Sequence, residues 1–167
     1  MAAARRRAQK WRKIAIASTV IIVVSLVVGS NLLVGYEMVN GSSLKILSVY
    51  FAPGTSSTIG NILVDAELEF TGRTDWDSPK GLQQIGDPTY SAMLNETPTP
   101  VSACFTDRIY ITPNDFISCN LMIANVSLTG IAGSSLTITY TGIVHYYLYY
   151  ERVTLSDSMA LGTVSVI

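Results

Sequence analysis

The residues that could support acid–base or nucleophilic chemistry are few. His145 is the single histidine, and no Gly-x-Ser-x-Gly pattern marks a strained nucleophile. General acid–base catalysis needs a proton-transferring side chain beside a nucleophile, or two carboxyl groups in different environments. Since His145 stands in a run of strand-forming residues, a structural hydrogen bond explains it more simply. The sequence therefore predicts a protein that is not an enzyme, with no catalytic residue and no cofactor.

Carboxylates gather at two places where a cation could bind. Asp65, Glu67 and Glu69 alternate along one expected strand, so they share a face at intervals of about 7 Å. A solvated face that discourages edge pairing explains this ladder more simply than calcium. Asp75 and Asp77 lie in an irregular segment, 71–100, and offer hard oxygen ligands without the full spacing of a calcium loop. We assign no metal site and leave open whether the Asp75/Asp77 loop binds calcium.

The two cysteines are Cys104 and Cys119, both C-terminal to the apolar segment described below. An even cysteine count in an exported domain favours a disulfide. Closing a loop of about 15 residues would stabilise the fold by roughly 3 kcal/mol in the chain-entropy model. We therefore predict a Cys104–Cys119 disulfide, with free buried cysteines as the alternative.

Three sequons begin at Asn40, Asn95 and Asn125. The pattern is short and arises often by chance in a chain rich in Ser and Thr. Asn95 lies in the irregular segment and is the favoured glycan carrier. Asn40 is close to the expected membrane, and Asn125 lies in an expected strand. All three are glycosylation candidates of an exported glycoprotein.

The composition of the chain changes sharply near residue 13, where a basic segment ends and an apolar segment begins. Six of the eleven Lys and Arg residues lie in 1–13, and 14–35 contains no ionisable side chain. As a helix, this run spans roughly 33 Å, close to the hydrocarbon thickness of a bilayer. The positive-inside rule places 1–13 in the cytoplasm and the remainder outside. We predict a single-pass signal-anchor in the cell membrane, with a basic cytoplasmic tail (1–13), a transmembrane helix (14–35), a linker (36–43) and an extracellular domain (44–167).

Two other fates of this helix stay open. A secretory signal peptide ends at small residues, and 28–30 would suit such a cut, although the apolar run is longer than usual. Arg12-Lys13 followed by the apolar run 14–24 resembles the leader of archaeal type IV pilin-like surface-appendage proteins. That resemblance implies a clipped basic leader and a hydrophobic helix that forms a filament core. The chain departs from that family's pattern because no Gly or Ala directly follows Lys13.

The part after residue 35 is acidic and strand-forming. It holds five basic residues against all twelve acids, which argues against nucleic-acid binding. Segment 61–70 alternates apolar and polar residues, which is typical of a half-buried strand. Seven or so strands with Gly, Pro and Asn turns predict a mainly β fold, an antiparallel β-sandwich of immunoglobulin-like architecture. The other strands are expected at 44–52 (ended by Pro53-Gly54), 90–94, 108–112, 116–128, 136–153 (bent at Gly142) and 162–167.

Four tyrosines surround Leu148 in segment 146–150. On one continuous strand, Tyr147 and Tyr149 would share a face opposite to that of Tyr146 and Tyr150. Tyrosine is favoured where one end of the ring stays wet, so one face could meet a protein or a glycan. A central strand packed on both faces between the core and a second surface explains this run more simply. If one face instead meets a partner, Tyr147 and Tyr149 are the interface candidates and Tyr146 and Tyr150 face the core.

Small residues mark one face of the apolar helix. Ser25 and Gly29 are four apart, and Ser18 lies one heptad before Ser25. This spacing lets another helix approach closely, so all three are interface candidates.

These patterns predict a membrane-anchored extracytoplasmic β-sandwich protein with a structural, assembly or binding role in a cell envelope, surface appendage or membrane complex. Its expected partners are membrane lipid and either other proteins or further copies of itself, with a glycan possible and nucleic acid excluded. The alternatives are a pilin-like filament subunit and a non-catalytic accessory subunit of a membrane enzyme complex.

Overall fold

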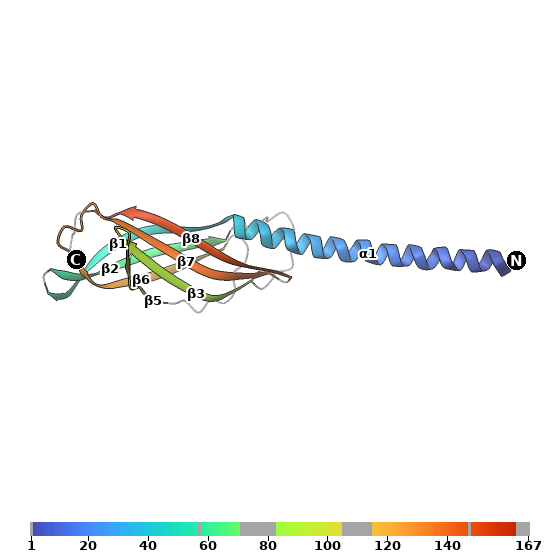
Figure 1. Ribbon diagram of the computed structural model, residues 1–167, viewed down its shortest axis with the longest axis horizontal. Helices are drawn as coiled ribbons and strands as arrows, with labels where there is room; N and C mark the ends of the chain where they lie inside the picture. Colours follow the sequence, from blue (N-terminus) through green and yellow to red (C-terminus); the bar gives the residue numbers. More distant parts are fainter. Residues whose placement is uncertain (1, 57, 71–82, 105–114, 147, 163–167) are drawn as a thin grey trace.

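The computed structural model describes residues 2–56, 58–70, 83–104, 115–146 and 148–162. One long helix, α1 (Ala2–Asn40), projects from one end of a β-sandwich, as Figure 1 shows. The chain is thus mainly β with a long apolar N-terminal helix, which confirms the predicted fold class. The strands are β1 (Ser42–Ser56), β2 (Ile59–Phe70), β3 (Gln83–Leu94), β4 (Thr97–Thr99), β5 (Ser102–Cys104), β6 (Asp115–Ser127), β7 (Ser135–Tyr146) and β8 (Tyr149–Ala160).

The eight strands form two four-stranded sheets with the orders β1-β2-β6-β5 and β4-β3-β7-β8. Every pair of neighbouring strands is antiparallel. If the strands are lettered A, B, C, C′, D, E, F and G in chain order, the sheets read A-B-E-D and C′-C-F-G. This is the immunoglobulin arrangement with one added strand. The connectivity therefore agrees with the architecture that the sequence predicts.

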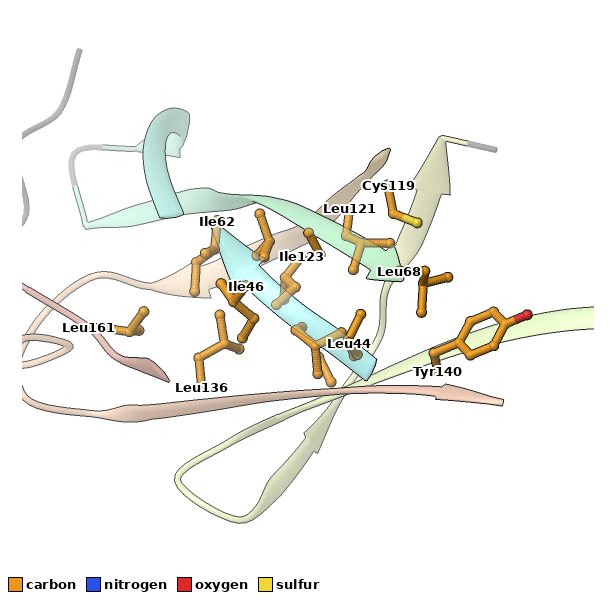
Figure 2. Packing of buried hydrophobic residues seen from close by; sticks show 14 of the residues in the cluster. Leu44, Ile46, Ile62, Leu68, Cys119, Leu121, Ile123, Leu136, Tyr140 and Leu161 are labelled. Atoms are coloured by element: carbon orange, nitrogen blue, oxygen red, sulfur yellow. The ribbon is translucent and has the colours of Figure 1, made fainter. Parts of the chain in front are cut away.

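Strand β2 shows how the sequence pattern produces the core. Ile62, Val64, Ala66 and Leu68 are at most 1% exposed, and the alternate residues face outward. Apolar side chains of the second sheet, such as Leu136, point at them from the opposite side (Figure 2). Because each fully buried Val, Leu or Ile side chain contributes about 1.5–3 kcal/mol, this interior is the main source of the sandwich's stability.

The segment 136–153 is a hairpin and not the single bent strand that we expected. β7 and β8 pair without a register shift up to Tyr146, which lies opposite Tyr149. Gly142 does not make a bulge. It is buried, and a Cβ at that position would lie 2.2 Å from the Tyr140 hydroxyl oxygen, so Gly142 makes room for that hydroxyl. The sequence could not show the turn because residues 147 and 148 are Tyr and Leu, which are not turn formers.

Strand β1 also differs from its prediction, because it continues through Pro53-Gly54 to Ser56. β1 is an edge strand, where a proline without an N–H group is tolerated, and the register shifts between Pro53 and Ser56. The expected strand 90–94 is the end of the longer β3. The predicted strand 108–112 and residues 163–167 lie outside the described residues.

Candidate functional site

Helix α1 is joined directly to the sandwich. It ends at Asn40 and β1 starts at Ser42, so the predicted linker 36–43 is wrong. The Gly41 N–H donates a hydrogen bond of 2.9 Å to the Glu37 carbonyl, which closes the last turn. Met38 is 0% exposed and belongs to the hydrophobic core, which explains why these residues stay helical. The helix and the sandwich therefore share one interior.

A glycine–tyrosine contact fixes α1 against the hairpin. α1 contacts β7 and β8, and the Tyr149 ring lies on Gly35 so closely that a Cβ there would be 2.3 Å from the ring's Cγ. The Tyr149 hydroxyl donates a hydrogen bond to the Glu151 carboxylate. Desolvation and the hydrogen bond to Glu151 raise the pKa of Tyr149 from its ordinary value of 10.0 to about 12.

The hairpin turn changes the roles expected for the tyrosines. Tyr149 is partly buried and packs against the core cluster and α1, so it does not lie on a free aromatic face. Tyr150 is 67% exposed, so the prediction that it faces the core is wrong. The physical reason is that the turn ends one strand and starts another, and the alternation of faces restarts. Tyr147 and the side chain of Tyr146 lie outside the described residues.

The small-residue face of α1 is free of the sandwich. Ser18, Ser25 and Gly29 are exposed, and a Cβ at Gly29 would meet no atom within 4 Å. Gly35 lies six positions after Gly29, which places the two about 120° apart around the helix axis. The segment Gln9–Asn40 contains an 18-residue stretch with a mean hydropathy of 2.3 and is long and apolar enough to cross a bilayer. A signal sequence near the N-terminus can also satisfy this criterion.

The outer face of the β1-β2-β6-β5 sheet carries an apolar row that sequence reasoning missed. Tyr50, Leu63 and Met122 are register neighbours and are 43%, 37% and 38% exposed. Leu63 and Met122 line a hollow of about 380 Å³ together with Asp65. The Ser48 hydroxyl donates a 2.8 Å hydrogen bond to the Asp65 carboxylate, so the next pair of register neighbours on this face is polar. Only the register shows this row, because its members come from three separate strands.

Cys119 is a free, buried cysteine, so the predicted Cys104–Cys119 disulfide is not formed. The backbone of Cys104 is paired in register with Asn120 and not with Cys119, and the Cys104 side chain lies outside the described residues. The Cys119 Sγ lies 2.9 Å from the Tyr90 hydroxyl oxygen. Burial raises the pKa of the Cys119 thiol, while the hydrogen bond to Tyr90 opposes that shift. Burial also raises the pKa of Tyr90 above its ordinary value.

The three sequon asparagines occupy different environments. The Asn40 amide donates a 2.8 Å hydrogen bond to the Tyr36 carbonyl within α1. The Asn95 side chain donates to the Ser134 hydroxyl and accepts from the Ser135 N–H, both at 2.9 Å. Asn95 and Glu96 have φ of 47° and 65° and form the two-residue turn between β3 and β4. Asn125 is exposed with φ 58°.

The remaining sequence candidates are placed as follows. Asp65 and Glu67 are partly exposed and Glu69 is exposed, all on the outer face of β2. Within the described ranges, no three potential metal-ligating side chains come together. Asp75, Asp77 and the side chain of His145 lie outside what the structure describes.

Comparisons with known proteins give little beyond this geometry. No protein-family model matches the chain, and no curated protein is similar to it. Among solved structures, the crystal structure of a protein from Archaeoglobus fulgidus is similar over 73% of this chain and 100% of that chain, with 11% sequence identity and a TM-score of 0.40. A similarity this weak indicates neither a shared family nor a shared function.

Proposed function

We propose that this chain is a single-pass membrane protein whose extracellular β-sandwich has a structural role in an assembly. The observation that carries the proposal is the direct junction between α1 and the sandwich. A domain that only needs to be tethered works with a flexible linker, whereas here Met38 and Gly35 fix the helix direction relative to the sandwich. A fixed direction is useful when the sandwich must meet neighbours at one angle.

The exposure of α1 supports the membrane part of this proposal. Ile16, Ile21 and Leu26 are 57%, 65% and 67% exposed, and the sandwich covers none of them. Exposed apolar surface of this extent needs an external apolar partner, and a bilayer fits its length. The basic residues of 1–13 favour a cytoplasmic N-terminus.

Fractionation and crosslinking test this proposal. Native membranes should retain the full chain after a carbonate wash, and external protease should digest the sandwich but spare residues 1–13. Lysine- or carboxyl-directed crosslinking in those membranes should yield discrete higher-mass species. A chain released by carbonate, or one that stays monomeric and partnerless in its own membrane, would contradict the proposal.

A filament subunit is the second candidate, and the same junction favours it. In a filament, hydrophobic helices pack together in the centre and hold the outer domains at one angle, which a flexible linker would not allow. Mass spectrometry of the native N-terminus separates the two. An intact residue 1 supports the anchor, a terminus near Ile14 supports the filament, and a terminus near Asn31 indicates a secreted protein.

A further inference from the structure

The tip of the β7–β8 hairpin lies beside α1, at the end of the sandwich from which the helix projects (Figure 1). Tyr149, the first residue of β8, sits on Gly35. Gly35 is also the last residue of the uncharged run 14–35. The hairpin tip is therefore at the level where, under the proposed function, α1 leaves the hydrocarbon core.

Four described side chains near this level are apolar or aromatic and exposed. Leu148 at the turn is 63% exposed, Tyr150 is 67% exposed, and Tyr36 on α1 is 58% exposed. Leu33, less than one turn before Tyr36 on α1, is 52% exposed. Burial of a leucine side chain in an apolar medium contributes about 1.5–3 kcal/mol. Leu148 does not gain this stabilisation from the sandwich, because its side chain is exposed. Tyrosine is enriched at both membrane interfaces because its ring is apolar and its hydroxyl is polar.

Charged residues follow this group in the order expected from lipid to water. Glu37 comes two residues after Gly35, on the side of the sandwich. On the hairpin, Glu151 and Arg152 follow Tyr150 along β8, away from the tip. The exposed apolar side chains of the tip thus lie beside the end of the apolar run of α1, and charged residues follow on both elements.

We infer that the tip of the β7–β8 hairpin docks on the outer leaflet of the membrane that α1 spans, with Leu148 among the acyl chains and Tyr36 and Tyr150 among the headgroups. The inference rests on the proposed function, since it needs α1 in a bilayer. Lipid is the occupant because the exposed tip lies beside the outer end of the lipid-facing surface of α1. The sandwich is then held at the membrane by two points of contact, the helix and the hairpin.

Tryptophan quenching by brominated lipid tests this docking. The two native tryptophans are replaced (Trp11→Phe, Trp76→Phe) in the full chain, which is reconstituted in phosphatidylcholine vesicles. One tryptophan is then introduced in each of three variants. Leu148→Trp probes the tip, and Val24→Trp probes the centre of the apolar run. Met93→Trp is the matched control, because Met93 is 41% exposed on β3 and pairs with Thr137, about 30 Å along β7 from the tip.

The expected result is that bromines on the part of the acyl chains nearest the headgroups quench Leu148→Trp about two-fold or more beyond Met93→Trp, since Leu148 enters the outer end of the acyl chains. Bromines deep in the acyl chains should quench Val24→Trp. If Val24→Trp is quenched and Leu148→Trp behaves like Met93→Trp, the docking is wrong while the anchor stands. If Val24→Trp is not quenched, the anchor and the docking both fail. A blue-shifted Leu148→Trp that no brominated lipid quenches would mean that a second copy covers the tip, which also overturns the inference.

Discussion

Helix α1 and the sandwich core are built from the same aliphatic side chains in opposite surroundings. Ile21 and Leu26 on α1 are 65% and 67% exposed, whereas Ile62 and Ile138 in the sandwich are 0% exposed. The sandwich buries its apolar residues between two sheets, so it needs nothing else to cover them. α1 presents apolar residues around its circumference, and its cover must come from outside the chain. Hydrophobicity alone therefore does not distinguish a buried core strand from an exposed apolar helix, because the surface that covers each one differs.

The largest effect should come from removing a core side chain. Ile138→Ala should lower the free energy of unfolding by about 2–5 kcal/mol, because it removes buried methyl groups and leaves a cavity. Its matched control is Ile21→Ala on α1, which should change the stability of the sandwich by less than about 0.5 kcal/mol. Urea unfolding of the full chain in mild detergent, followed by near-UV circular dichroism, measures both. Equal losses would show that α1 and the sandwich interior are not energetically distinct.

The next effect concerns the place where the two regions meet. Gly35→Ala puts a Cβ 2.3 Å from the Tyr149 ring, so the contact must open, at a cost of about 1–3 kcal/mol. Gly29→Ala adds the same methyl group where no atom lies within 4 Å, and it should stabilise the helix by roughly 0.5–1 kcal/mol. Glu-specific proteolysis after Glu37, together with urea unfolding, reports on the junction. If the Gly35→Ala chain resists the protease and urea as well as the Gly29→Ala chain does, then α1 can move away from Tyr149 without weakening the junction.

A smaller effect separates two adjacent tyrosines. Tyr149→Ser removes a ring packed against α1 and should cost about 1–2 kcal/mol of stability, because the side chain is only partly buried. Tyr150→Ser removes a ring that is 67% exposed and should stay within about 0.5 kcal/mol. Thermal melts of both variants in detergent measure the difference. The reverse order would restore the expectation that Tyr150 faces the core.

The smallest effect at neutral pH belongs to Cys119. Burial raises the pKa of its thiol in the folded chain above the ordinary 9.0, so the unfolded chain loses its proton first. Stability should therefore fall as the pH rises above 9, by at most about 1.4 kcal/mol per pH unit from one thiol. Cys119→Ala should make this fall less steep. Thiol labelling gives a second readout, because the buried Cys119 should react without reductant only after denaturation. Failure to label in denaturant would restore the predicted disulfide.

Much of the sandwich was predictable because its pattern is local. The alternation in β2 alone indicates which residues face inward, and those residues are the ones buried. The turn between β7 and β8 was not predictable, because Tyr147 and Leu148 have no turn preference and the flanking residues all favour strands. The prediction that β1 ends at Pro53 was wrong for a related reason. Whether a proline ends a strand depends on which edge its nitrogen faces, and that is decided by the partner strand.

The candidate site was predictable only in part. Ser18, Ser25 and Gly29 were found from their spacing, and they are exposed on one side of α1. Tyr149 was found as an aromatic residue, but its partner Gly35 was not, since the two are far apart in the sequence. The cysteine count suggested a disulfide, yet the register sets Cys104 opposite Asn120 and leaves Cys119 beside Tyr90.

The sequence by itself determined the apolar helix, its basic N-terminal flank, the acidic character of the remaining chain and the inward faces of its strands. These are properties of residues a few positions apart, and the periods of helix and strand make them readable. The tertiary structure alone decided that α1 enters the sandwich without a linker, that Tyr149 packs on Gly35 and that the hairpin tip lies at the end of the apolar run. Each of these depends on register and close packing between distant segments, which no local period encodes.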